Sequence, residues 1–448
     1  MSGAVAAHAA YNGSGTQGLA VTNKIQGNDG DVMSVFWNKN DTTRQLLYGS
    51  AFVEIPSSSG SGGNALSKAN TQIFEVNNDI DCLGNLILKV VVAGVTTASG
   101  GTGLIEPCAA ATIIDRIEFQ VGTQIWQTLE KVDILALATT ELPESAYSDF
   151  VFQSSGGISD LLVNNTIGAG TSAGINNIYY TTTTGVTAYI PLKMLTKTLA
   201  PQLESFSEHT ESGYLMAAAP NQQVKIKIYT SIASPAIVVT AAATANTAFG
   251  DADFAPSGTI NLSLFAQQHV MCNEEREQML AVPNGLPRRI KMTQNVQQAV
   301  TTASTSFNIV LDTFSLYASH LIISIPSDVL TFAAHYKYEA STIELLLNSS
   351  SFSGALPFGL LNVIPSSLGL YNNNYITNGD SQNPYEVFVF PLASKAYGGS
   401  CVPLNRFDNI TLKFKLQAVP SVAGTIYVTC VGETTALYNG GAASLAMY

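Results

Sequence analysis

Alternation of apolar and charged side chains in two short segments constrains the fold more than any other feature of the sequence. Thr411–Leu416 has leucine or phenylalanine at every second position and lysine between them, and Val224–Ile228 repeats the arrangement with valine and isoleucine. A period of two places successive side chains on opposite faces of a strand. Each segment therefore predicts a β-strand with one face in an apolar core and the other in polar surroundings.

The strand patterns occur twice, in the same order. Four segments of the first half correspond to four of the second: Leu86–Val92 to Leu321–Ile325, Ile117-Glu118 to Ile343-Glu344, Tyr189–Leu192 to Val389–Leu392, and Val224–Ile228 to Leu412–Leu416. Such a repeat indicates two similar domains, and 448 residues suit two domains of about 200 residues each. All-β units with frequent turns are sandwiches or barrels, and periodicity alone does not choose between these two architectures.

Shorter patterns complete the domain plan. Ile113–Leu129 predicts a hairpin that turns at Gly122-Thr123, and Val132–Thr140 is the best helical candidate. Residues 145–188 are rich in Ser, Gly, Asn and Thr, which predicts a long outer loop. The plan has five parts: an N-terminal arm at 1–44, a first unit at 45–232 that includes the loop, a linker at 233–258, a second unit at 259–435, and a C-terminal tail at 436–448.

The composition excludes several classes of protein. Charged residues make up 12% of the chain and hydrophobic residues 46%, whereas disordered chains combine low hydrophobicity with high charge. The net charge of −12, without a basic cluster, argues against direct binding of nucleic acid. Polar residues interrupt Ala233–Phe249, the most apolar long run, so membrane insertion is not expected. The N-terminal segment lacks the charged and apolar regions of a secretory signal peptide.

No pattern predicts an enzyme, a cofactor or a metal site. Five cysteines without metal-ligand spacing predict free thiols in a reducing compartment: Cys82, Cys108, Cys272, Cys401 and Cys430. The five histidines are isolated, and the GxSxG match at Gly170–Gly174 lies in a loop, whereas a nucleophile elbow joins a strand to a helix. We therefore predict no catalytic, cofactor-binding or metal-binding residues. Among six N-glycosylation sequons, Asn164 in the long loop is the candidate for glycan attachment.

The order of several motifs resembles that of the major capsid proteins of nucleocytoplasmic large DNA viruses. In the second half, Phe390–Ala393 ends a strand, Gly398–Ser400 turns, and Asn405–Leu412 leads into the alternating strand. In the first half, the resemblance rests on the segments Phe74–Val76, Asp79–Leu86, Ile117–Gly122, Ile190–Leu192, Tyr214-Leu215 and Gln223–Ile226. The resemblance implies an all-β fold of two consecutive eight-stranded antiparallel jelly-roll sandwiches.

The same resemblance implies a structural function without catalysis. The expected protein forms a homotrimer, a pseudo-hexagonal capsomer that tiles the icosahedral shell of a large double-stranded DNA virus. Its expected partners are neighbouring capsomers and minor capsid and penton proteins, and its location is the virion, assembled in the host cytoplasm. The alternative is a carbohydrate-binding or adhesive pair of β-sandwiches, which needs exposed aromatic platforms. Only Trp37 and Trp126 are available as tryptophans, and Trp126 lies within the predicted hairpin.

Overall fold

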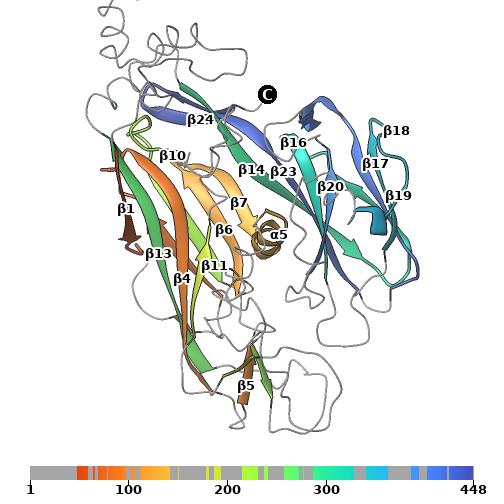
Figure 1. Cartoon of the computed structure of the whole chain (residues 1–448), viewed down its shortest axis with the longest axis horizontal. Coiled ribbons are helices and arrows are strands. Elements are labelled where there is room, and N and C mark those ends of the chain that lie inside the picture. Colours follow the sequence, from red (N-terminus) through yellow and green to blue (C-terminus); the bar gives the residue numbers. More distant parts are fainter. Residues whose placement is uncertain are drawn as a thin grey trace, which may run out of the picture. The chain divides into compact units, whose positions relative to one another are not determined.

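The computed structural model is all-β apart from a few short helical segments (Figure 1). It describes residues 48–58, 64–65, 69–77, 79–96, 102–105, 111, 113–141, 150, 178–180, 186–192, 214–230, 237–240, 257–271, 276, 286–326, 340–361, 385–392, 401–420 and 423–446. The predicted arm at 1–44 and Asn164 lie outside these residues. One compact unit, Ser50–His269 with Val282–Tyr448, contains both sandwiches, and the second unit, Met1–Gly49 with Val270–Ala281, contains few described residues.

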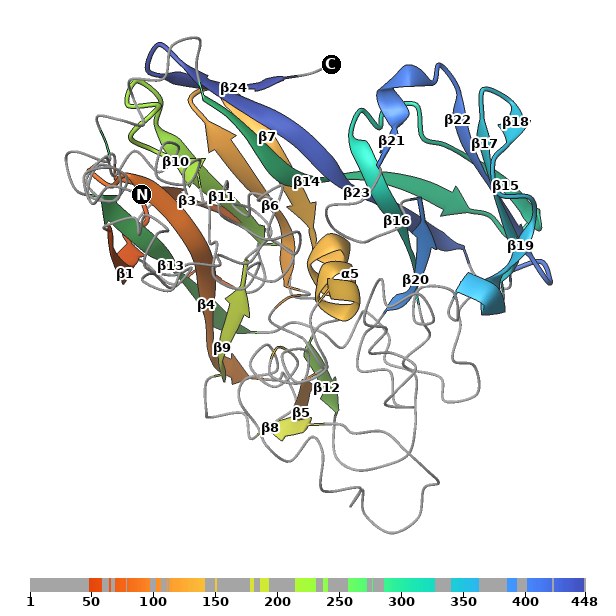
Figure 2. The same cartoon turned by 45° about the horizontal axis from the view of Figure 1, so that its top comes forward.

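The first sandwich consists of two antiparallel sheets. One sheet has the order β1 (Tyr48–Ile55), β13 (Ser257–Met271), β4 (Cys82–Thr96) and β10 (Tyr214–Leu215); in addition, β9 (Val186–Pro191) pairs with β4 and β2 (Asn64–Ala65) with β13. The other sheet has the order β3 (Asn70–Glu75), β11 (Val224–Thr230), β6 (Ile114–Val121) and β7 (Gln124–Glu130), and its strands lie side by side in Figure 2. The predicted hairpin is confirmed as β6 and β7.

The second sandwich repeats this plan. One sheet has the order β14 (Leu286–Val300), β23 (Gly424–Asn439), β16 (Tyr317–Pro326) and β20 (Tyr385–Pro391); β21 (Val402–Pro403) pairs with β16 and β24 (Ala442–Ala446) with β23. The other sheet has the order β15 (Ser306–Val310), β22 (Ile410–Leu416), β17 (Ala340–Leu347) and β18 (Ser350–Ser351), and β19 (Leu356–Pro357) pairs with β17.

The strand order identifies both sandwiches as jelly rolls. The eight main strands of each, counted along the chain, form one sheet in the order 1-8-3-6 and a second in the order 2-7-4-5. The fold class predicted from the sequence, two consecutive antiparallel jelly rolls, is therefore confirmed. In the first roll, β9 and β10 both pair with β4 and together take the sixth place. Counted in this way, all four repeated segments occupy the same strand in both rolls: the third, fourth, sixth and seventh.

At residue level the repeat is shifted by two positions in one strand. Ile117 of β6 pairs with Ile228, whereas Ile343 of β17 pairs with Phe414. The sequence repeat matches Phe414 with Ile226. If Ile117 is equivalent to Ile343, the strand pairing instead matches Phe414 with Ile228. A shift of two residues keeps every side chain on its face, so the alternation could not reveal it.

The strand pairing also moves boundaries of the domain plan. The sequence places the start of the second roll at residue 259, but Ser257–Met271 pairs with β4 and belongs to the first roll. The predicted linker at 233–258 contains β12 (Ile237–Thr240), which forms a small sheet with β5 (Thr102–Ile105) and β8 (Ile178–Tyr180). The predicted tail at 436–448 contains the end of β23 and all of β24. The stretch of small residues before β13 resembles a linker between domains, and the pairing of β13 with β4 is a long-range contact that has no local sequence pattern.

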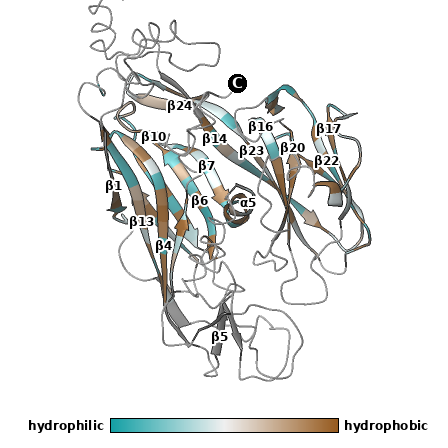
Figure 3. Cartoon of the chain, in the orientation of Figure 1, coloured by the Kyte–Doolittle hydropathy of each residue, from teal (hydrophilic) through white to brown (hydrophobic). Residues whose placement is uncertain are grey.

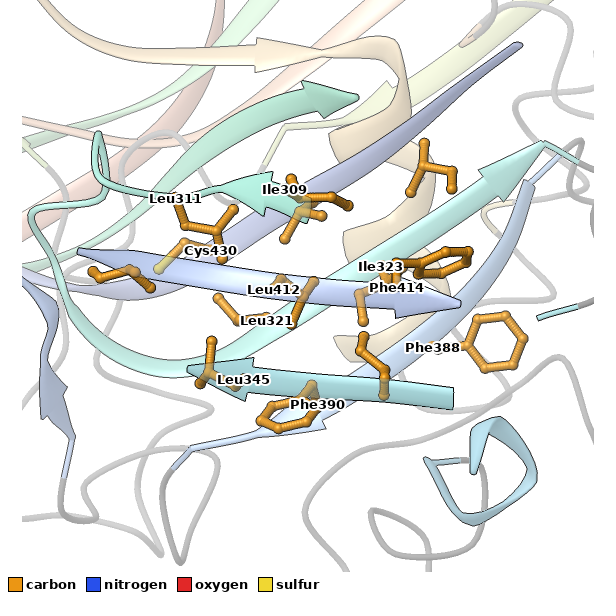
Figure 4. Packing of buried hydrophobic residues seen from close by; sticks show 14 of the residues in the cluster. Ile309, Leu311, Leu321, Ile323, Leu345, Phe388, Phe390, Leu412, Phe414 and Cys430 are labelled. Atoms are coloured by element: carbon orange, nitrogen blue, oxygen red, sulfur yellow. The ribbon is translucent and has the colours of Figure 1, made fainter. Parts of the chain in front are cut away.

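Each roll is held together by the inward faces that the alternation predicts. Val224, Ile226 and Ile228 of β11 are buried, and the lysines between them are half-buried. Apolar and polar bands accordingly alternate along β6, the neighbour of β11, in Figure 3. In the second roll, Phe414 of β22 lies in the apolar layer shown in Figure 4, where it makes an edge-on ring contact with Phe358 at a centroid distance of 5.1 Å.

The predicted helix is confirmed as α5 (Lys131–Glu141), which follows β7 directly. It begins with a capping interaction, because the backbone N–H of Glu130 donates to Oδ2 of Asp133 at 2.9 Å. All nine residues from Val132 to Thr140 are buried. A helix that is buried on all sides must be covered by more than its own roll.

Candidate functional site at the junction of the two rolls

One sheet of the second roll is buried on both faces. Its inward face belongs to the core, and the opposite face, called the junction face here, carries the buried residues Lys291, Thr293, His320, Ile322, Ser324, Val387, Val389, Thr429 and Val431. The first roll covers this face, since α5 contacts β16 and β20, and β7 contacts β14. Four consecutive apolar residues in β20, Val387–Phe390, reflect this burial on both faces.

A buried carboxylate at the start of α5 joins the two rolls. Oδ1 of Asp133 accepts hydrogen bonds from Oγ1 of Thr429 at 2.6 Å and from Nδ2 of Asn295 at 2.9 Å. Nδ2 of Asn295 also lies 3.0 Å from Oγ1 of Thr429. Because burial disfavours the charged form, the pKa of Asp133 is raised, although its three hydrogen bonds act in the opposite direction.

Two further hydrogen bonds flank this carboxylate. Nε2 of Gln127 donates to Oγ1 of Thr293 at 3.1 Å, and Nε2 of Gln297 donates to Oε2 of Glu130 at 2.6 Å. Burial, and then the nearby Asp133, raise the pKa of Glu130. Side chains of β7 and α5 thus bond directly to side chains of β14 and β23, so the junction has specific polar contacts as well as apolar packing.

Aromatic rings make a second connection between the rolls. Tyr214 of β10 contacts Phe119 and Trp126 of its own roll at centroid distances of 5.9 and 5.3 Å. Its ring also lies 5.6 Å from that of Tyr438, which belongs to β23 of the second roll. Trp126 is 5% exposed, so it cannot serve as the exposed platform that a carbohydrate-binding protein needs.

No protein-family model and no curated protein matches the sequence. Among solved structures, the PBCV-1 virus capsid aligns with a TM-score of 0.64 and 12% identity over 93% of this chain and 99% of that chain. The Faustovirus major capsid protein aligns with a TM-score of 0.61 and 9% identity over 91% and 92% of the two chains. The chain has the fold of viral major capsid proteins.

This capsid fold accounts for both rolls. A third structure, PBCV-1 VP54 fitted into a reconstruction of the virophage Sputnik, aligns with a TM-score of 0.63 and 13% identity over 93% of this chain and 99% of that chain. Each of these structures is therefore aligned over nearly its whole length. The likeness covers the tandem arrangement as well as the single sandwich.

The residues with reactive side chains are dispersed through the capsid fold. Cys82 and Cys430 are buried and Cys401 is half-buried, and none of the three is disulfide-bonded. Nδ1 of buried His320 lies 2.8 Å from Oγ of Ser319, and burial followed by the charge of Lys291 lowers the pKa of His320. Among the described residues, no group of three His, Cys, Asp or Glu side chains could hold a metal ion. No helix in the described ranges is long and apolar enough to cross a membrane.

Several candidate residues lie outside the described part of the chain. These are Cys108, Cys272, Asn164, Trp37, the GxSxG segment at 170–174, and His8, His209 and His335. Sequence reasoning did not identify the junction residues Asp133, Asn295 and Thr429. The run of apolar residues in Val387–Phe390 was a usable signal, because it indicates a strand buried on both faces.

Proposed function

We propose that this protein is a major capsid protein that trimerises into pseudo-hexagonal capsomers and tiles the icosahedral shell of a large double-stranded DNA virus. The observation that carries the proposal is the alignment of both rolls, with 93% of this chain covered, to the PBCV-1 virus capsid. Three chains with two rolls each supply six similar units around a threefold axis. Such a trimer has the approximate sixfold outline that a hexagonal lattice needs.

The junction supports this role physically. A capsomer must keep its six rolls at fixed angles, because neighbouring capsomers repeat the same contacts across the shell. The hydrogen bonds of Asp133 and the burial of α5 hold the two rolls of one chain together. We propose that each chain enters the trimer as one preformed building block.

The proposed role is structural and does not include catalysis. Its support is that the described histidines, His269 and His320, are buried, as are two of the three described cysteines. Proposed partners are two further copies of the chain, neighbouring capsomers, and minor capsid and penton proteins. The acidic net charge of −12 favours contact with these proteins over direct contact with the genome.

The proposed location is the virion, with assembly in the host cytoplasm. That Cys82, Cys401 and Cys430 are not disulfide-bonded is in keeping with synthesis in a reducing compartment. We propose further that residues 145–188 project from the outer, distal side of the trimer, where a glycan on Asn164 would be accessible. The segment follows α5 along the chain and ends in the first three residues of β9. The part before β9 is a long stretch without apolar period, which suits a surface loop.

The oligomeric mass tests the proposal. Light scattering after size-exclusion chromatography is expected to give three times the chain mass of 47.3 kDa, and negative-stain images of the same sample are expected to show hexagonal outlines. A monomer at all accessible concentrations would contradict the capsid role. Binding to a glycan array by that monomer would favour the carbohydrate-binding alternative.

A further inference from the structure

The C-terminal hairpin, defined here as residues 436–446, is paired with the second roll but contacts the first. It comprises the end of β23, the turn at Gly440 and Gly441, and β24. Both glycines have positive φ, +61° and +79°, as a two-residue hairpin turn requires. A Cβ atom on Gly441 would lie 2.7 Å from Nδ2 of Asn221, a residue of the first roll. The turn therefore lies directly against the loop that precedes β11.

Three hydrogen bonds connect the hairpin with this part of the first roll. The backbone N–H of Asn221 donates to the carbonyl of Gly441 at 3.1 Å. The backbone N–H of Ala443 donates to Oε1 of Gln222 at 2.6 Å, and that of Leu215 donates to the hydroxyl oxygen of Tyr438 at 3.3 Å. The first roll donates two of these hydrogen bonds and the hairpin donates one. The three bonds are spread along the length of the hairpin.

One side chain of the hairpin, that of Tyr438, is buried in an aromatic contact with the first roll. Tyr438 is 3% exposed, and its ring packs on Tyr214, which in turn contacts Trp126 and Phe119. Ala443 on the neighbouring strand is also buried. Burial of a tyrosine ring removes a large apolar area from water, so the contact stabilises the docked position of the hairpin.

This contact is distant from the Asp133 network. Thr429 and Tyr438 lie on the same strand, nine residues apart, which corresponds to about 30 Å at the rise of an antiparallel strand. One localised connection between two rigid bodies leaves them free to pivot in every direction, whereas a second connection at this separation leaves only rotation about the line that joins the two. The hairpin supplies the second connection.

We propose that the C-terminal hairpin is a clasp that couples the second roll to the first, so that the two rolls open and unfold as one cooperative unit. The clasp is a property of the single chain and does not depend on the capsid role. Its loss would leave the two folded rolls with the contacts that β7, α5 and the Asp133 network make between them.

Hydrogen exchange on the full-length chain tests the clasp. Gln222→Ala removes the acceptor for Ala443, and Gln223→Ala is the matched control, because Gln223 contacts Glu75 within the first roll. Tyr438→Ala removes the ring contact with Tyr214, and Tyr438→Phe removes only the hydroxyl group. The readout is the exchange rate of segments 214–222 and 436–446, with β22 as the internal reference.

If the hairpin couples the rolls, the hydrogen-exchange rates of 214–222 and 436–446 should rise together, by about tenfold in Tyr438→Ala and by less in Gln222→Ala. The exchange rate of β22 should not change in any variant, and Gln223→Ala should change none of these rates. Calorimetry is expected to show one unfolding transition for the wild type and two for Tyr438→Ala. The proposal is overturned if exchange rises only in 436–446 while a single transition persists. If Tyr438→Ala does not fold, Gln222→Ala and Tyr438→Phe decide by the same exchange criterion.

Discussion

Oδ1 of Asp133 and Oγ1 of Thr429 form a hydrogen bond of 2.6 Å, although 296 positions separate the two residues in the sequence. The carboxylate is the N-terminal capping group of α5 in the first roll, and the hydroxyl lies in the middle of β23 in the second. A single side chain therefore stabilises a helix end and joins two domains. Mutations at this position report on both roles.

Removing the Asp133 carboxylate should destabilise the chain. Asp133→Ala leaves Thr429, Asn295 and the N–H of Glu130 without this acceptor, and each buried donor left unpaired costs about 1–3 kcal/mol. Because neighbouring effects are not additive, we expect the free energy of unfolding to fall by about 2–4 kcal/mol in chemical denaturation. The control, exposed Asp79→Ala, should change it by about 0.5 kcal/mol or less. Equal effects of the two changes would contradict the role of the junction.

The raised pKa of Asp133 predicts a specific dependence of stability on pH. The folded state holds the proton to higher pH than the unfolded state, whose carboxyl titrates near 3.9. The stabilising contribution of this group is complete below the unfolded pKa and is lost as pH rises through the raised folded pKa. Relative to Asp133→Asn, the wild type should lose stability across this window and then remain constant. If the wild type instead gains stability over Asp133→Asn as pH rises, the hydrogen bonds to the carboxylate outweigh its desolvation.

The alternating strands predict contrasting effects of neighbouring substitutions. Phe414 is 1% exposed, and Phe→Ala in a core typically costs about 3–5 kcal/mol. The side chain of Lys413 is 50% exposed, and its Nζ lies 3.6 Å from Oε2 of Glu344. Lys413→Ala should therefore lower the stability by about 0.5 kcal/mol or less. The same contrast is expected for Ile226→Ala against Lys225→Ala in the first roll. Melting temperature and soluble yield measure it, and equal damage from the lysine changes would mean that the strand faces are reversed.

The cysteines should remain thiols but differ in reactivity. Burial, and then the nearby Cys401, raise the pKa of Cys430, which leaves little of the reactive thiolate at neutral pH. Cys401 is half-buried, so mass spectrometry after brief alkylation of native protein should find it modified before Cys430. Titration of unfolded, unreduced protein should find all five thiols. Finding only one or three would be incompatible with assembly in a reducing compartment.

Deleting residues 165–185 tests the loop assignment. The deletion removes β8, which pairs with β5 in the small sheet and with no other described strand. Both jelly-roll cores should therefore survive, and the trimer should form with nearly unchanged melting temperature. Loss of soluble trimer would show that the segment is structural.

The extent to which sequence predicts this fold depends on how each strand is exposed. In β11 and β22 one face is buried, and the other is half-buried in β11 and largely exposed in β22. Alternation in Val224–Ile228 and Thr411–Leu416 therefore identified the strands and their inward faces. β13 was assigned to the second roll, because the small side chains before it resemble a linker and its pairing with β4 leaves no local pattern. Asp133 was not identified because its partners Asn295 and Thr429 lie far away in the sequence. A hydrogen bond between distant polar residues has no local periodicity.

Burial of β20 on both faces limits how its sequence can change during evolution. Phe388 and Phe390 belong to the core of the second roll, whereas Val387 and Val389 lie on the junction face, which the first roll covers with α5 and β7. None of these four positions can drift freely, because a change disturbs either the core or the junction. Divergence among descendants of this protein should therefore be slow in β20 and should require compensating changes in α5. The polar positions of β22, such as Lys413 and Lys415, carry no such constraint, so substitutions can accumulate there.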